Sequence, residues 1–473
     1  MTLRAHIEES WAKDVLPTLT DYITIPNVSM AYDHQWEANG HMEAAVGLIQ
    51  DWCAARPITG LAVDVQRIPG RSPLIVGEVP ASDPALADRT VLLYGHLDKQ
   101  PEFTGWREGL GPWTPVIEGD RLYGRGSADD GYAAFAALLA IEAAQAEGRP
   151  HARCVILIEA SEESGSPDLP AHLEALAGRL GEPELVICLD SGCLDTDHLW
   201  VTTSLRGLAG GTLTVEVLTE GVHSGKASGV VPSSFRLLRQ ILDRVEDSTT
   251  GRILLPELHV DVPSERVEAA RHTAADLAHP IAADYPWTGS TRPMTDDPVE
   301  QQLNRTWRPT LSYTGADGFP SAGRAGNVLR PSTSLALSFR LPPTCDHVAA
   351  LAAVERAVLS DPPSGATVRF DEAGSGPGWS APAFAPWLSA ALDEASTAAF
   401  GHPARSFGEG GSIPFMGMLG ELFPAAQFVV TGVLVPGSNA HGPNEFLHLP
   451  TARRVTECVA RLLDAHAASP SSS

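Results

Sequence analysis

Four short apolar segments constrain the fold of this chain more than any other feature of its sequence. They are rich in Val, Ile and Leu and do not alternate with polar residues: Val91–Gly95, Val155–Glu159, Leu185–Leu189 and Phe428–Val433. Unbroken apolar runs of this length are typical of strands that are covered on both faces, as in a parallel sheet. Helical stretches separate the first three, at Tyr132–Glu147 and Leu169–Leu180. This alternation predicts an α/β fold with a mostly parallel sheet.

The middle of the chain follows a different pattern and indicates an inserted domain. Leu213–Leu218 and Ser334–Leu341 alternate apolar and polar residues, Pro232–Val245 between them is a predicted helix, and AGSGPGWSAP marks the exit. Alternation is typical of strands with one buried and one solvated face. A chain of 473 residues also exceeds what one hydrophobic core usually organises. We therefore predict an α+β domain at residues 204–378, inserted into a discontinuous α/β domain at residues 1–203 and 379–473.

The ends of the chain and its charge exclude several classes of protein. Residues 3–24 and 41–55 are predicted helices, and neither a signal-peptide core nor an uninterrupted membrane-spanning run is present. The net charge of −25 repels nucleic acid and anionic membranes, so we expect neither as a partner. The six cysteines are scattered without a CxxC pair, which argues against a disulfide framework. We therefore expect the protein in the reducing cytoplasm.

Polar side chains follow the predicted strands at the point where each strand ends. His96 and Asp98 follow the first strand, and a glycine-rich turn delivers Asp129 and Asp130 before a helix. Glu162 and Glu163 follow the second strand, Asp190 follows the third, and His441 comes after the last. Ligands of open α/β sheets bind outside the carboxyl ends of the strands, so we expect these residues to converge.

The residue types at these strand ends predict a metal site. Two imidazoles and three carboxylates can fill two neighbouring sites for zinc or a similar metal if one carboxylate bridges them. His96 and Asp98 are two residues apart and point the same way on an extended backbone, so Asp98 can orient the imidazole. One member of the pair Glu162 and Glu163 can bind metal while the other faces water. Without cations, so many clustered carboxylates are very unfavourable.

An ordered set of motifs carries a family resemblance. In chain order they are YGHLDKQP, GDRLYGRGSADD, EASEESGSP, VICLDSG, GVHSGKASG, LSFRLPP, GEGGSIPF and GSNAHGPNE. With these motifs the chain resembles the M20 family of metallopeptidases, especially its cytosolic non-specific dipeptidase, or carnosinase-like, branch. The motifs cover both predicted domains in the family's order, and the set is much more specific than any one segment.

The resemblance implies a two-metal centre and a role for each of its residues. His96 and Asp190 would hold one divalent ion, Glu163 and His441 the other, and Asp129 would bridge them through a cis peptide to Asp130. Glu162 would be the general base, and Asp98 would orient His96. Zn²⁺ is the expected metal, and Mn²⁺ or Co²⁺ also suits these ligands.

The resemblance also assigns the inserted domain as a lid and dimerisation domain. His223 would reach into the partner's site across a homodimer, Arg340 would bind the substrate's C-terminal carboxylate, and Gly411 and Ser412 would line the substrate pocket. Two departures concern the substrate rather than the metals. Gly131-Tyr132 follows the Asp pair where the branch commonly has Lys-Gly, and Asn327 precedes VLRP where the branch often has Thr.

The predicted function is therefore hydrolysis of the amide bond of dipeptides or similarly small peptide-like substrates. A metal-bridging hydroxide would attack with Glu162 as general base, and both metals would lie in the α/β domain. The runner-up is a deacylase or amidohydrolase of the same superfamily that acts on N-acyl amino acids. A non-catalytic binding protein that kept the fold is the alternative from another class. A serine hydrolase is disfavoured because the chain has no G-x-S-x-G motif.

Overall fold

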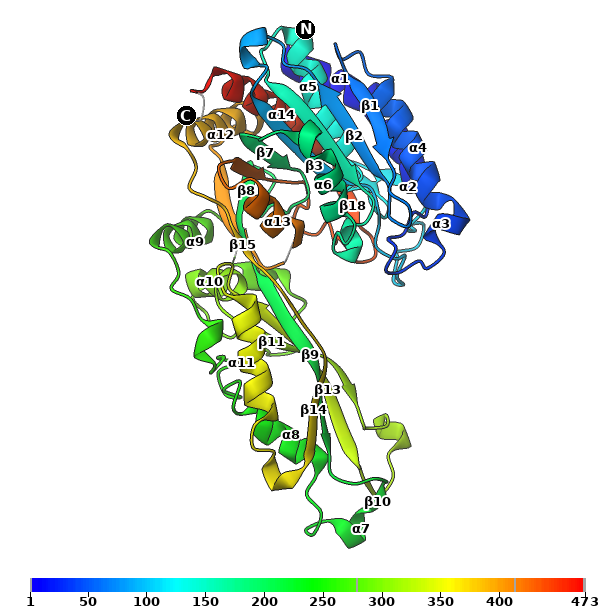
Figure 1. Ribbon diagram of the computed structural model, residues 1–473, viewed down its shortest axis with the longest axis vertical. Coiled ribbons are helices and arrows are strands. Elements are labelled where there is room, and N and C mark those ends of the chain that lie inside the picture. Colours follow the sequence, from blue (N-terminus) through cyan, green and yellow to red (C-terminus); the bar gives the residue numbers. More distant parts are fainter. Residues whose placement is uncertain (1, 278–279, 412–413, 471–473) are drawn as a thin grey trace. The chain divides into compact units, whose positions relative to one another are not determined.

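The structure is a computed structural model that describes residues 2–277, 280–411 and 414–470. The chain divides into two compact units, which are coloured along the sequence in Figure 1. Unit 1 comprises Met1–Thr203, Ala381–Phe407 and Met418–Ser473, and unit 2 comprises Ser204–Ser380 and Gly408–Gly417. The second unit thus contains a segment, Gly408–Gly417, that lies outside the inserted domain as we bounded it from the sequence. No helix in the described part of the chain is long and apolar enough to cross a membrane.

The main sheet of unit 1 is mixed, with a parallel centre. The four predicted apolar segments form its four central strands, in the order β6 (Arg153–Glu159), β3 (Thr90–His96), β7 (Leu185–Cys188) and β17 (Gln427–Val430). These four pair in parallel. Antiparallel strands β1 (Ala62–Gln66) and β2 (Leu74–Val79) extend the sheet beyond β6. On the other side, β8 (Trp200–Leu205) pairs antiparallel with β17 and with β15 (Trp379–Ser380), and β16 (Arg405–Glu409) also pairs with β8. The α/β class is confirmed, and the flanking strands make the sheet mixed.

Helices cover both faces of this sheet. On one face α5 (Ala133–Glu147) contacts β3 and β6, and it packs in turn against α14 (Leu449–Ala468) and α1 (Leu3–Ser10). Twelve of the fifteen α5 residues are buried, as expected of an Ala-rich helix that is apolar on all sides. Figure 1 shows α6 (Leu169–Leu180) on the opposite face. The other helices of unit 1 are α2 (Leu16–Ile23), α3 (Trp36–Asn39), α4 (His41–Ala54) and α12 (Pro386–Phe400).

The predicted helix at residues 3–24 is interrupted by a wider turn. Residues Trp11–Val15 between α1 and α2 are π-helical. Pro17 stands in the first turn of α2 and has no amide hydrogen to donate to the preceding turn. The missing donor at Pro17 is the local feature that accompanies the π-helical turn. A hydrophobic pattern alone does not reveal such a turn.

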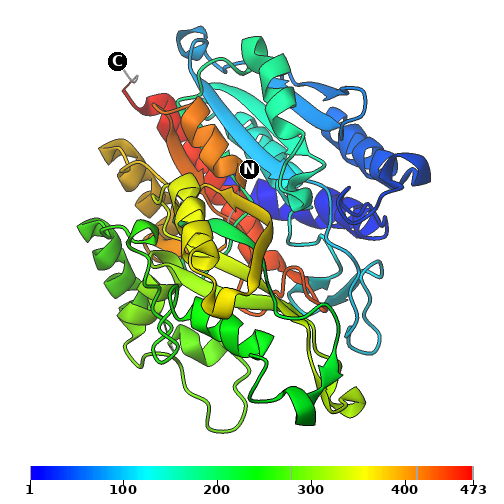
Figure 2. The same cartoon turned by 60° about the horizontal axis from the view of Figure 1, so that its bottom comes forward.

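Unit 2 contains a four-stranded antiparallel sheet with helices on one face. Its strand order is β11 (Thr310–Asp317), β13 (Ser332–Leu341), β9 (Gly207–Glu216) and β14 (Thr367–Gly376). The helices α8 (Ser234–Leu242) and α11 (His347–Leu359) lie against β9, β13 and β14, and Figure 2 shows the same units from another side. The predicted exit segment begins inside β14. Further elements are β10 (Val222–His223), α7 (Ser224–Ala227), α9 (Ser264–Asp276), α10 (Pro298–Thr306) and β12 (Val328–Leu329). The helix α13 (Pro414–Leu422) is divided between the units after Gly417.

A small sheet in unit 1 joins two loops that are far apart in the sequence. It consists of β18 (Phe446–His448), β5 (Arg121–Tyr123) and β4 (Val116–Glu118), all antiparallel. The glycine-rich turn follows β5, and the loop that carries His441 precedes β18. The backbone N–H of Gly124 donates to the carbonyl of Glu445 at 3.0 Å, so the start of the glycine-rich turn lies beside the end of the loop that carries His441.

Candidate metal centre

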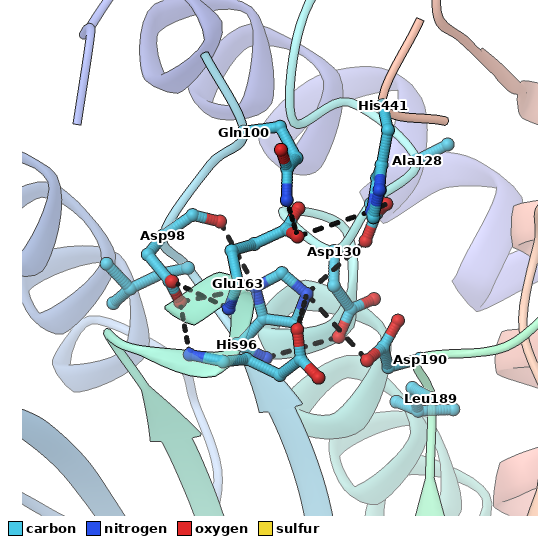
Figure 3. Close-up of polar contacts among 12 residues, drawn as sticks. His96, Asp98, Gln100, Ala128, Asp130, Glu163, Leu189, Asp190 and His441 are labelled. Carbon is cyan, nitrogen blue, oxygen red and sulfur yellow. Dashed lines mark hydrogen bonds and ion pairs between the residues drawn. The ribbon is translucent and has the colours of Figure 1, made fainter. Parts of the chain in front are cut away.

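The carboxyl ends of the central strands bring the predicted residues together. His96 is the last residue of β3, Glu162 and Glu163 follow β6, and Asp190 follows β7. Parallel strands end at the same edge of a sheet, which is why these side chains meet. Figure 3 shows Glu163 and Asp190 around the His96 ring, with His441 approaching from the loop after β17. All of these residues lie in unit 1.

Asp129 lies between the two histidines and presents one carboxylate oxygen to each. Its Oδ1 is 3.3 Å from Nε2 of His96, and its Oδ2 is 3.0 Å from Nε2 of His441. Two sets of side chains can each hold a cation, since the ligand atoms within each set lie within 4.8 Å of one another. One set is His96, Asp129 and Asp190, and the other is Asp129, Glu163 and His441. Asp129 is the member common to both, and its peptide bond to Asp130 is cis.

The chemistry of this donor set fits divalent cations. Nε2 of His96 is buried and has no well-aligned hydrogen bond to any described residue, although it lies 3.3 Å from Oδ1 of Asp129, 3.8 Å from Oδ2 of Asp190 and 3.9 Å from Oε2 of Glu162. A buried imidazole nitrogen without a partner is costly, and a metal ion at that nitrogen removes the cost. Imidazole and carboxylate together suit zinc and its neighbours. The arrangement can therefore hold two cations that share Asp129.

The pKa shifts of the site residues show that positive charge would stabilise the clustered carboxylates. Burial and the negative charge of Asp190 raise the pKa of Glu162 well above its usual value, and burial and Asp129 raise the pKa of Glu163. Burial lowers the pKa of His441, but the hydrogen bonds with Asp129 and Glu163 outweigh it and raise that pKa to about 11. Burial also lowers the pKa of His96, but the nearby carboxylates of Asp129, Asp98 and Asp190 outweigh it and raise that pKa well above its usual value. Divalent cations would supply the charge that these protons otherwise carry.

Asp98 contacts both His96 and the turn that holds the two glutamates. Nδ1 of His96 is 3.1 Å from the backbone carbonyl of Asp98 and 3.4 Å from its Oδ1. The Asp98 carboxylate also accepts hydrogen bonds from the backbone N–H groups of Glu162, at 3.1 Å, and Glu163, at 3.0 Å. This fully buried side chain therefore lies where it can orient the imidazole, and it also fixes the backbone of the Glu162–Glu163 turn.

Gln100 is a contact of the site that our reading of the sequence missed. Its Nε2 donates to Oε2 of Glu163 at 2.6 Å, and the same oxygen lies 3.2 Å from Nε2 of His441. Figure 3 shows Gln100 and His441 approaching this carboxylate together. Gln100 stands two residues after Asp98. The alternation that grouped His96 with Asp98 was therefore the signal that could have included it.

The predicted residues of the inserted domain lie in two separate places within unit 2. His223 ends β10 and is exposed, and its Nδ1 accepts a hydrogen bond from Gly225 at 3.1 Å. Asn327 lies beside it, because its carbonyl accepts from the N–H of Ser224 at 2.9 Å. Arg340 lies near the other end of the four-stranded sheet, opposite Leu208 of β9. Gly411 is exposed and accepts from the N–H of Arg206; Ser412 lies outside the described residues.

Solved structures share the fold of the whole chain. A di-peptidase, Dug1p from Saccharomyces cerevisiae, superposes with a TM-score of 0.77 at 24% identity and covers 99% of this chain and 98% of its own. Human carnosine dipeptidase 1 superposes with a TM-score of 0.73 at 21% identity, with 99% of both chains covered. At these identities the likeness establishes the fold alone.

Curated relatives and a family model match the sequence itself. A cysteinylglycine-S-conjugate dipeptidase of Corynebacterium striatum is 27% identical over 416 residues, which cover 86% of each chain. A Cys-Gly metallodipeptidase of Schizosaccharomyces pombe is 29% identical over 60% of this chain and 59% of its own, and human Beta-Ala-His dipeptidase is 28% identical over 52% and 48%. The model of peptidase family M20/M25/M40 matches residues 92–465, well over half of the sequence. The chain therefore belongs to peptidase family M20/M25/M40.

Proposed function

We propose that this peptidase hydrolyses the amide bond of dipeptides or similarly small peptide-like substrates at a centre of two divalent cations. The observation that carries the proposal is the position of Asp129, whose two carboxylate oxygens each face a different histidine. The proposed ligands are His96 and Asp190 for one cation and Glu163 and His441 for the other, with Asp129 shared. The dipeptidase names of the relatives support the substrate class.

Glu162 is the proposed general base. When bound, the two cations supply Lewis-acid chemistry and bring the pKa of water toward neutrality. Glu162 belongs to neither ligand set, yet its Oε2 lies 3.9 Å from Nε2 of His96. From this position its carboxylate would take the proton of the attacking water and give it to the leaving amine. Asp98 holds the backbone N–H of Glu162 and so keeps the base in place.

Unit 2 is the proposed source of substrate recognition. Arg340 would bind the terminal carboxylate of the substrate through a bidentate pair, which favours very short peptides. Gly411 and Ser412 would line the substrate pocket with Arg340, and Asn327, which lies beside His223, would contact the substrate together with His223. The exposed position of His223 supports its role as a residue that acts in the partner's site across a homodimer.

A second candidate is hydrolysis of N-acyl amino acids by the same residues. It is favoured by Asn327, since asparagine is common at this position in other hydrolases of the M20 family, whereas the dipeptidase branch often has threonine. Both substrate classes carry a free carboxylate for Arg340 and an amide bond for attack. A panel that pairs each dipeptide with the corresponding N-acetyl amino acid separates them.

The test combines metal content with hydrolysis of a substrate panel. We expect about two zinc, manganese or cobalt ions per chain, cleavage of dipeptides such as Cys-Gly and β-Ala-His, and loss of cleavage after chelation. Asp129→Asn keeps the size of the side chain and should lose both ions, whereas His441→Gln should lose one. Two ions with cleavage of N-acetyl amino acids alone favours the second candidate. A protein that binds no metal even when metal is supplied contradicts the proposal.

A further inference from the structure

A cavity within unit 2 combines arginines with aromatic walls. It has a volume of about 230 Å³, and its lining includes Arg206, Tyr285, Trp287, Met294, Gln301 and Arg305. Among the lining residues that the structure describes, none is an aspartate or a glutamate. Two arginines without a described acid make the lining locally positive, although the whole chain has a net charge of −25. Its local charge therefore suits an anionic ligand.

The two arginines of the cavity converge with Arg340. A Cβ atom added to Gly410 would lie 3.2 Å from Cγ of Arg305 and 3.3 Å from Nη2 of Arg206, so both side chains lie against the same glycine. Nη1 of Arg206 donates to Oγ1 of Thr310 at 3.1 Å, and Thr310 is the residue opposite Arg340 in the sheet. Burial, followed by the positive charges of Arg340 and Arg305, lowers the pKa of Arg206 to about 10. Three guanidinium groups thus share one end of the sheet.

Two buried polar atoms in the cavity wall have no hydrogen-bond partner among the described residues. They are Nε of Arg305 and Oε1 of Gln301, and the two residues lie four apart on α10. Side chains at this spacing are neighbours on one face of a helix. One atom is a donor and the other an acceptor, so together they can bind a carboxylate and an adjacent N–H group. Leaving such atoms unpaired is unfavourable, which is a reason to expect a ligand here.

The aromatic side of the cavity provides an apolar surface for the body of that ligand. Tyr285 and Trp287 form an edge-to-face pair with ring centroids 6.0 Å apart. Their side chains remain 49% and 43% exposed, and Met294 is 77% exposed. Apolar surface beside a few polar groups that point into one space is typical of small-molecule sites. An amino-acid side chain with a short methylene stem and a terminal carboxylate matches both parts of the lining.

We propose that this cavity binds an acidic side chain on the C-terminal residue of the substrate. The proposal rests on the proposed function, because Arg340 would hold the main-chain carboxylate while Arg206 and Arg305 hold the second one. The substrate class is then narrowed to dipeptides that end in glutamate or aspartate. The neutral amides of the same shape are the disfavoured analogues, since an amide oxygen makes a weaker hydrogen bond to a guanidinium group than a carboxylate does.

The test compares isosteric substrates that differ in one charge. We expect kcat/KM for Ala-Glu to exceed that for Ala-Gln by at least about tenfold, mainly through KM, since charge-assisted hydrogen bonds are about twice as strong as neutral ones. Arg305→Gln should bring the ratio close to one. Arg292→Gln removes the same charge from an exposed residue of unit 2 that does not line the cavity, and it should keep the ratio. Gln301→Leu gives a second cavity variant if Arg305→Gln does not fold.

The outcomes separate this inference from the proposed function. If Ala-Gln and Ala-Glu are cleaved equally well, the cavity assignment is overturned and the peptidase proposal stands. If neither is cleaved, calorimetric titration with glutarate tests the cavity alone. Binding to the wild type that is lost in Arg305→Gln supports an anion site, and the absence of binding overturns it. If Arg292→Gln loses the preference for Ala-Glu as fully as Arg305→Gln does, the cavity assignment is also overturned, because long-range charge would then explain the effect.

Discussion

Arg125 and Glu445 form a buried salt bridge between the loops that carry Asp129 and His441. Nη1 of Arg125 donates to Oε2 of Glu445 at 2.6 Å, and neither side chain is more than 1% exposed. Oε1 of Glu445 accepts from the backbone N–H of Asp129 at 3.3 Å, while Nη2 of Arg125 donates to the carbonyl of Gly442, next to His441, at 2.8 Å. The pair thus connects both sides of the second proposed cation site.

Replacing Glu445 by glutamine should weaken metal binding without removing a ligand. The substitution leaves the charge of Arg125 buried without its partner, which typically costs about 3–5 kcal/mol, and it loosens the loop that positions His441. We expect a loss of metal affinity of roughly 10–100-fold, measured by competition with a chelating dye. Glu118→Gln, which breaks the exposed pair of Arg107 and Glu118, is the matched control. A folded Glu445→Gln protein with wild-type metal affinity would show that the bridge stabilises the fold only.

Replacing Glu162 by glutamine should stop turnover and leave the metal content unchanged. Glutamine keeps the size of the side chain but cannot take a proton, and general bases contribute roughly 10²–10⁴-fold in rate. The measurement is kcat on the best dipeptide together with metal analysis of the same sample. Glu163→Gln is the comparison, since its loss should lower metal content as well. Near-normal turnover of Glu162→Gln means that another residue is the base.

The role of His223 across a dimer can be tested by mixing two inactive variants. His223→Ala alone and Glu162→Gln alone should each have low activity. In a mixed dimer the His223→Ala subunit keeps its own Glu162 and receives His223 from the partner, so one complete site forms and activity returns. Subunits are exchanged under mild denaturation, and kcat is followed against the mixing ratio. If mixing restores nothing although mixed dimers form, His223 does not act in the partner's site.

His466 should make unit 1 less stable as the pH falls below about 6.5. It is fully buried in α14, where burial and the positive charge of Arg89 lower its pKa to about 4, against a hydrogen bond with Glu184. Between pH 6.5 and 4, His466 therefore binds a proton in the unfolded chain but not in the folded chain. The free energy of unfolding falls across this window, by at most about 3 kcal/mol.

The check is denaturant unfolding at several pH values for the wild type and for His466→Gln. The variant has no imidazole to protonate, so its stability should fall less than that of the wild type between pH 6.5 and 4. Trp387 lies against His466, with ring centroids 5.7 Å apart, and offers a local fluorescence signal. Parallel pH curves for the two proteins would show that His466 does not contribute to the acid sensitivity.

The predicted strands and the observed ones agree where the signal is local. Unbroken apolar runs identify strands that are covered on both sides, and all four became the parallel centre of the sheet. The antiparallel strands at the edges give a weaker sequence signal. They are half exposed, as β1 shows, or lack an unbroken apolar run. The sequence pattern reports burial and not direction, so it does not distinguish a mixed sheet from a parallel one.

The contacts around the candidate metal centre also divide into predictable and unpredictable ones. His96, Glu163 and Asp190 are predictable because each directly follows an apolar strand. The hydrogen bond from Gln100 to Glu163 and the bridge between Arg125 and Glu445 are not, because each joins residues that are far apart in the sequence. The segment Gly408–Gly417 joins unit 2 for a similar reason: Arg206 binds the carbonyl groups of Gly410 and Gly411.

By itself, the sequence determined which residues stand at the ends of the strands, and hence which chemical groups the site can contain. Periodicity and residue type are local properties, and they are written in the order of the chain. Only the tertiary structure decided that one oxygen of Asp129 faces His96 and the other faces His441. That orientation depends on side-chain torsions held by contacts with distant segments, such as Glu445 at the N–H of Asp129. The arginine cavity of unit 2 likewise exists only once Arg206, which precedes β9, has packed together with β11 and α10.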